Sequence, residues 1–265
     1  MKKSLTVVIA LLLLCTVFFS GCSAPEDNAL QLDPRKLNCG VYTYATRIVN
    51  GDVAIEYNTV YTVTKYNDNG TDMIRIESNG EREGETIHSV NDLLGAQKGE
   101  LTPFSSIKVS MEYKNQANSQ NDVIVDVAHT HDKGSLTIKL QQYPSGANEM
   151  ETREITVATG KQYYDSESLP FIIGCLKLEK DMTLNFTLSS SNRDALQSMN
   201  LAVADVSEID INGQKVECYC VTVRPNTMFS HFATLMYYRT SDQRLMMIKQ
   251  ETVTFTLTDF QPEQA

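Results

Sequence analysis

The feature of the sequence that most constrains its fold is a two-residue alternation of apolar and polar side chains. It recurs along most of the chain. In residues 107–113, Ile107, Val109, Met111 and Tyr113 alternate with Lys108, Ser110 and Glu112. Successive side chains of a β-strand point to opposite faces, so the pattern predicts strands with one dry and one wet face. Antiparallel sheets have this pattern because one of their faces can remain in water.

Turn sequences separate the predicted strands. Asn50-Gly51-Asp52 and Asn212-Gly213 supply the residues that tight hairpin turns require. We predict strands at residues 41–49, 53–66, 72–78, 107–113, 122–128, 135–142, 152–158, 181–189, 201–211, 214–224, 232–239 and 244–260. Residues 81–99 are polar and contain several glycines, so we expect no strand there, only a short helical piece near residues 90–94.

An apolar stretch at residues 165–180 lies between these two β-rich parts. Leu169, Ile172, Ile173 and Leu176 have the spacing of one helix face, and Phe171, Cys175 and Leu178 form a second stripe. Pro170 suits a first helical turn because it lacks an N–H group. We therefore predict a short helix near residues 169–178 that is covered on nearly all sides.

No Pro/Gly/Ser-rich linker flanks this stretch, which favours one domain over two. The predicted domain covers residues 38–261 and is mainly β. We expect one large curved antiparallel sheet, a β-roll or half-barrel, around the short central helix.

The N-terminus has the three parts of a secretory signal. Lys2 and Lys3 precede an apolar run at residues 5–19, which is too short for a comfortable membrane span. Ser20-Gly21-Cys22 follows, and this end resembles the signal of bacterial lipoproteins. An ordinary signal peptide cut nearby is the alternative.

The lipoprotein resemblance implies how the mature chain is held. It implies that residues 1–21 are removed and that Cys22 carries a diacylglycerol and an acyl chain such as palmitate, which gives stable membrane residence. Residues 22–37 are polar with two prolines and are predicted to be a flexible tether. The expected location is extracytoplasmic, lipid-anchored to the bacterial cell membrane or the outer membrane.

The charge of the chain excludes some partners. Lys+Arg number 23 against 33 Asp+Glu, a net charge of −10, and loss of Lys2 and Lys3 makes it more negative. Such a surface repels nucleic acid and anionic headgroups, so we expect no nucleic-acid partner.

Motifs for catalysis or metal binding are not found. The sequence has no GxSxG, HExxH, P-loop or GxGxxG pattern, so we predict neither an enzyme nor a cofactor. His129-Thr130-His131-Asp132 could offer zinc ligands, but strand ends attract His and Asp and no second motif supports a metal site. The cluster at residues 67–72 contains the Asn, Asp and Gly that a turn needs, and its spacing differs from that of a calcium loop.

Four cysteines remain after Cys15 and Cys22, and a disulfide is possible outside the cytoplasm. Cys218 and Cys220 lie two apart on one predicted strand and should not bridge each other. Either could bridge Cys39 or Cys175, and the alternative is that all four are buried thiols.

Several segments occur in an order that resembles a known group of proteins. They are Val41-Tyr42-Thr43-Tyr44, Asp165 with Ser168-Leu169-Pro170-Phe171, Ile211-Asn212-Gly213-Gln214-Lys215-Val216, Cys218-Tyr219-Cys220-Val221, Leu235-Met236-Tyr237-Tyr238 and Arg244-Leu245-Met246-Met247. This order resembles an envelope domain family of unknown function, which is similar to the half-barrel fold of lipoprotein-localisation carriers. The resemblance implies a curved sheet that wraps a helix and leaves an apolar cavity, and it implies no activity.

Two functions follow as hypotheses. In the first, an apolar small molecule such as an acyl chain binds in a cavity between sheet and helix, lined by Leu169, Phe171, Ile172 and Leu176. In the second, the domain has a filled core and acts as a structural or protein-interaction domain without a ligand.

Overall fold

One sheet accounts for most of the chain. The computed structural model describes residues 30–130, 134–143, 149–158, 163–189, 196–226 and 233–263. The predicted signal peptide and Cys22 lie outside these residues. The sheet has 15 strands: β1 (Gly40–Asn50), β2 (Val53–Asp68), β3 (Thr71–Arg82), β4 (Glu85–Leu94), β5 (Ser106–Asn115), β6 (Val123–Thr130), β7 (Ser135–Gln142), β8 (Glu151–Ala158), β9 (Tyr164–Asp165), β10 (Thr183–Ser189), β11 (Gln197–Ile211), β12 (Gln214–Pro225), β13 (Thr234–Arg239), β14 (Leu245–Lys249) and β15 (Val253–Pro262).

The strand order shows how the two halves of the chain join. The chain begins in the middle of the sheet and meanders from β1 to one edge at β8. It resumes at the opposite edge with β9 and returns through β10–β15, so that β15 pairs with β1. All neighbouring strands are antiparallel except β9 and β10, which are parallel. The predicted mainly β fold, with one large antiparallel sheet and a short helix, is confirmed.

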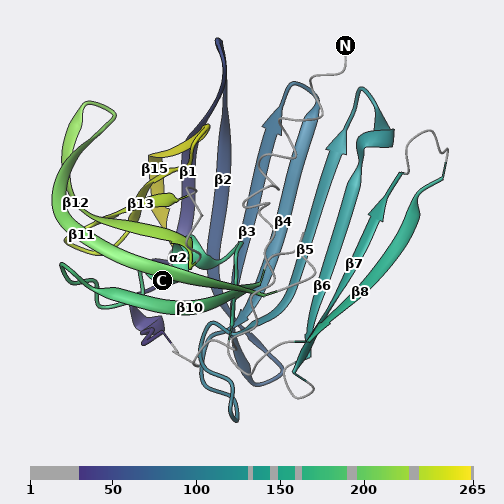
Figure 1. The fold of residues 1–265 in the computed structure, drawn as a ribbon, viewed down its shortest axis with the longest axis horizontal. Helices are drawn as coiled ribbons and strands as arrows, with labels where there is room; N and C mark the ends of the chain where they lie inside the picture. Colours follow the sequence, from purple (N-terminus) through teal and green to yellow (C-terminus); the bar gives the residue numbers. More distant parts are fainter. Residues whose placement is uncertain are drawn as a thin grey trace.

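The second half of the sheet folds over the first. In Figure 1, β10, β11 and β12 run across the lower part of the first strands, and helix α2 (Leu169–Ile173) lies between the two layers. We call the face of β2–β8 that is turned toward α2 and β10 the inner face. The sheet remains open, with β8 and β9 as its edges.

The prediction for residues 81–99 is wrong, because β4 occupies residues 85–94. Val90, Leu93 and Leu94 have helical spacing, which suggested a helical piece. In the structure the buried residues of the strand alternate as Ser89, Asn91 and Leu93, so two polar residues occupy core positions and hide the strand period.

The C-terminal strand prediction also needs correction. Residues 244–260 form two strands, β14 and β15, separated by a tight turn in which the Gln250 amide donates to the Val253 carbonyl at 2.8 Å. The turn contains none of the Gly, Asn, Asp or Pro residues that mark most turns, so the sequence reads as one long strand.

The central helix is shorter than predicted. Regular α-helix covers five residues, Leu169–Ile173, and single turns continue it through Cys175 and Leu176. Asp165, which begins the predicted stretch, belongs to β9.

Part of the predicted tether belongs to the domain. Leu30 and Leu37 are buried, and residues 34–36 form a 3₁₀ turn. The Asp33 amide donates to the Cys175 carbonyl at 3.0 Å, and the Leu30 amide donates to the Tyr164 hydroxyl at 3.0 Å. Residues 30–37 are therefore packed against the sheet rather than flexible, because their leucines add to its core.

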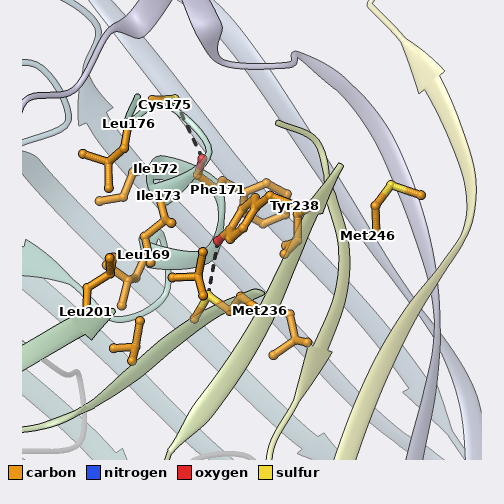
Figure 2. Close-up of a cluster of buried hydrophobic side chains, with 14 of the residues drawn as sticks. Leu169, Phe171, Ile172, Ile173, Cys175, Leu176, Leu201, Met236, Tyr238 and Met246 are labelled. Carbon is orange, nitrogen blue, oxygen red and sulfur yellow. Dashed lines mark hydrogen bonds between the residues drawn. The ribbon is translucent and has the colours of Figure 1, made fainter. Parts of the chain in front are cut away.

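Two apolar cores are present. The main core surrounds α2 and draws side chains from β1–β4 and from β9–β15; Figure 2 shows its centre. The second core lies on the inner face of β5–β8 and consists of Val109, Met111, Val125, Val127, Leu136, Ile138, Val157 and Tyr163. Cys39, Cys175, Cys218 and Cys220 are free thiols, so the possible disulfides are not formed.

Candidate functional site

A polar interruption divides the two cores. The cross-strand register places one row of inner-face residues side by side, namely Val63, Ile76, Asn91, Val109, Val127 and Ile138. Ile76 belongs to the main core and Val109 to the second, and Asn91 between them is the one polar member of the row. Its side chain is 1% exposed, so it lies at the floor of the boundary.

Asp165 covers this boundary from the opposite layer. It is 1% exposed, and its Oδ1 atom accepts from the Glu167 amide at 3.0 Å and from Asn91 Nδ2 at 3.5 Å. Its Oδ2 atom accepts from Ser189 Oγ at 3.2 Å and lies 3.9 Å from His129 Nε2. His129 Nδ1 lies 2.9 Å from the Tyr163 hydroxyl, and the two rings stack. We call Asn91, His129, Tyr163, Asp165 and Ser189 the polar seam.

Local structure fixes the position of Asp165. β9 is only two residues long and pairs with β10 through Leu188 with Tyr164 and Ser189 with Asp165. The next turn leads directly into α2, where Ser168 Oγ donates to the Asp165 carbonyl at 3.1 Å. The carboxyl is thus held between an edge strand and a packed helix, which leaves it little freedom to reach water.

The surroundings of Asp165 change its acidity. Burial, and then the charge of Glu167, raise its pKa to about 7, although hydrogen bonds from the Glu167 amide and Ser189 act in the opposite direction. Burial likewise raises the pKa of Glu167. The seam can therefore take up and release a proton near neutral pH. Because His129 and Asp165 are almost fully covered, the arrangement is a buried proton-binding group rather than an open catalytic cleft.

The four predicted ligand-binding residues lie together in the main core. Leu169, Phe171, Ile172 and Leu176 are all buried, and Figure 2 shows them beside Leu201, Met236 and Tyr238. The Phe171 ring lies 5.3 Å from that of Tyr42 and 5.2 Å from that of Tyr61.

A small cavity lies beside the helix. It is lined by residues that include Phe171, Gly174 and Tyr238, and its volume of about 10 Å³ has room for about one water molecule. This space is too small for an acyl chain.

Sequence reasoning missed most of the polar seam. No sequence motif marks Asn91 or Ser189 as part of a site. Asp165 is predicted only as the start of the apolar stretch that contains the helix. His129 was noted only as part of a His-x-His pattern, of which His131 and Asp132 lie outside the described residues. In the described part of the chain, no group of three or more His, Cys, Asp and Glu side chains could hold a metal ion. No described helix is long and apolar enough to cross a membrane.

Comparisons with known proteins provide no identification. No protein-family model matches the chain, and neither the curated proteins nor the solved structures include a match. The resemblance to lipoproteins and to an envelope domain family therefore stays a prediction.

Proposed function

We propose that the chain is a lipoprotein of the bacterial envelope, anchored through Cys22 outside the cytoplasm. The support comes from the sequence: two lysines, an apolar run at residues 5–19, and Ser20-Gly21-Cys22. Leu30 is already buried in the domain, so few residues separate the proposed anchor from the folded sheet. The proposed anchor thus keeps the domain close to the membrane surface.

Palmitate labelling of cells that express the full chain tests the anchor. Cys22→Ala should abolish incorporation, because the proposed lipid attachment needs the thiol of that residue. Cys15→Ser is the matched control, since Cys15 lies within the same signal, and it should be labelled like the wild type. Equal labelling of Cys22→Ala and wild type would contradict the proposal.

We further propose that the domain binds an elongated apolar molecule, such as an acyl chain, and is not an enzyme. The proposed ligand does not lie against Leu169, Phe171, Ile172 and Leu176, because these side chains are buried and the cavity beside Phe171 is too small for an acyl chain. The observation that carries it is a second row on the inner face, in which Gly80, Ile87, Tyr113 and Val123 pair across β3–β6. We call this row the apolar strip.

The apolar strip has the features of a binding surface. Ile87 and Val123 are half-buried, and the Tyr57 ring lies against Gly80, where an added Cβ would be 3.5 Å from the ring. Tyr113 is buried between Ile87 and Val123, so the strip exposes apolar area on both sides of its ring. Apolar area removed from water contributes about 25 cal/mol per Å², so a chain laid along it gains affinity.

A row of polar groups lies alongside the apolar strip, two residues further along β3, β4 and β5. Arg82 Nη2 lies 3.0 Å from Glu85 Oε2, and Asn115 Nδ2 donates to Glu85 at 3.2 Å and to the Tyr113 hydroxyl at 3.3 Å. Arg82 Nε is buried and has no hydrogen-bond partner within the described structure. An unpaired buried donor is costly, and an oxygen atom of a ligand headgroup would satisfy it.

Titration with cis-parinaric acid, a fluorescent acyl-chain probe, tests this binding surface in the full chain. Ile87→Gln should weaken binding roughly tenfold, because it exchanges an apolar contact for a polar one. Thr86→Gln is the matched control, since the neighbouring side chain lies on the opposite face of β4, and it should leave binding unchanged. Wild-type protein that does not bind the probe would contradict the proposal.

A structural or protein-interaction domain is the second candidate. The burial of the α2 side chains in the main core favours it, because such a domain needs no ligand cavity. It predicts that Ile87→Gln and wild type are alike with the acyl probe and that a partner protein co-purifies from cross-linked membranes.

A further inference from the structure

The polar seam is where the two halves of the sheet meet through polar contacts. Asp165 comes from the edge strand β9, and Ser189 comes from its neighbour β10. Asn91 comes from β4 and His129 from β6, on the inner face of the first half. Figure 1 shows β10 crossing that half, so the seam fixes the edge of one layer to the face of the other.

An ionised carboxylate is costly in this place. Ile76 and Val109 flank the floor of the seam, and both are almost fully buried. The bond from Asn91 is long at 3.5 Å, and His129 Nε2 lies at 3.9 Å, beyond hydrogen-bond distance. The bonds from the Glu167 amide at 3.0 Å and from Ser189 Oγ at 3.2 Å favour the ionised form but carry no positive charge, so burial still destabilises the carboxylate relative to its neutral form.

Within the described residues, the charged and titratable groups that face Asp165 are Glu167 and His129. Glu167 lies in the same turn and disfavours a second negative charge. His129 faces it from β6, with the Tyr163 hydroxyl behind the imidazole. The groups from β4 and β10, Asn91 and Ser189, are neutral.

We propose that the Asp165 carboxyl is a proton-dependent latch. In its neutral form it holds the β9–β10 edge on the inner face of β4 and β6, and its ionisation loosens that edge. The latch acts without any ligand and does not depend on the proposed binding function.

The direction of the pH effect follows from linkage. In the closed edge the pKa of Asp165 is about 7, whereas in an opened, hydrated edge it returns toward the ordinary value of 3.8. The closed state therefore binds more protons between these values, so acid favours closure and rising pH favours opening. His129 also faces the carboxyl, so its charge belongs to the same site. A comparison of wild type with Asp165→Asn isolates the contribution of the carboxyl.

Hydrogen exchange of the full chain in detergent micelles tests the latch. The probes are amides of the edge, including that of Ser166, which donates to the Ser189 carbonyl at 2.9 Å. After correction for the intrinsic pH dependence of exchange, the opening constant of the wild type relative to Asp165→Asn should rise roughly tenfold or more between pH 5.5 and 7.5. Asp126→Asn is the control, because Asp126 lies on the opposite face of β6 from His129, and it should follow the wild type.

Two results would overturn the latch. One is a ratio of the wild-type opening constant to the opening constant of Asp165→Asn that stays constant within about twofold across this pH range. The other comes from carbon NMR of the Asp165 carboxyl in the wild-type protein, which needs no variant to fold: a midpoint near 4, the value of a hydrated carboxyl, instead of near 7.

Discussion

At the scale of single residues, a buried polar side chain fixes the position of the central helix through a directed hydrogen bond, which apolar contacts do not provide. Tyr238 is fully buried on β13 and points toward α2 (Figure 2). Its hydroxyl donates to the Pro170 carbonyl at 2.6 Å, at the start of the helix. Burial raises the pKa of this tyrosine well above its ordinary value, so the donor is retained throughout the physiological pH range.

Tyr238→Phe should therefore lower the free energy of unfolding by about 1–3 kcal/mol, because the Pro170 carbonyl loses its donor in a buried place. Urea denaturation followed by circular dichroism measures the change. Tyr237→Phe, at the neighbouring half-buried position, is the control and should change stability by less than about 0.5 kcal/mol. Equal midpoints for Tyr238→Phe and wild type would contradict this and would show that water donates to the Pro170 carbonyl in place of the hydroxyl.

At the scale of elements, α2 is held by its surroundings rather than by its own hydrogen bonds. It has five residues, and the side chain of Ser168 at its N-terminus makes no capping bond. Helices this short are unstable alone, so packing must stabilise it. The tightest approach is at Gly174, where an added Cβ would lie 2.7 Å from the Gln243 carbonyl oxygen and 3.5 Å from the Tyr238 ring.

Gly174→Ala should destabilise the protein by about 1–3 kcal/mol, although alanine favours helix more than glycine does, because overpacking against backbone outweighs propensity. Thermal unfolding measures this effect. Gly80→Ala is the matched control, since a Cβ there meets its neighbours at ordinary distances of 3.5 Å and 3.7 Å. A higher melting temperature for Gly174→Ala would contradict this prediction. It would show that α2 can move away from the Gln243 carbonyl.

At the scale of the whole molecule, the strand order links the two halves. β1 pairs with β2 on one side and β15 on the other, so the sheet is continuous across its centre. The main core contains side chains from both halves and from residues 30–37. Neither half can bury this core without the other, because each supplies only one side of it.

The main core should accordingly unfold in one cooperative transition. We expect a calorimetric enthalpy close to the van't Hoff enthalpy when the full chain is heated in micelles at pH 5.5, where Asp165 is mostly neutral. Two well-separated heat-absorption peaks would show instead that β1–β8 and β9–β15 fold as independent units.

The sequence by itself determined the class of fold. Alternation along β5 and turn residues at 50–52 and 212–213 are local properties of the backbone, so they predicted strands and hairpins correctly. The apolar stretch around Phe171 predicted a central helix for the same reason, although its length was overestimated. The N-terminal residues also predict the proposed location, which rests on no tertiary contact.

Only the tertiary structure decided the strand order, the filling of the space around α2 and the existence of the polar seam. Asn91 and Asp165 are 74 residues apart, and no local pattern signals that they meet. At position 91 the sequence shows a polar residue where a core position should be apolar, so the two-residue period of a strand is hidden there and the sequence predicts a short helical piece instead. Burial and pairing depend on contacts between distant residues, so they become visible only when the second half of the sheet closes over the first.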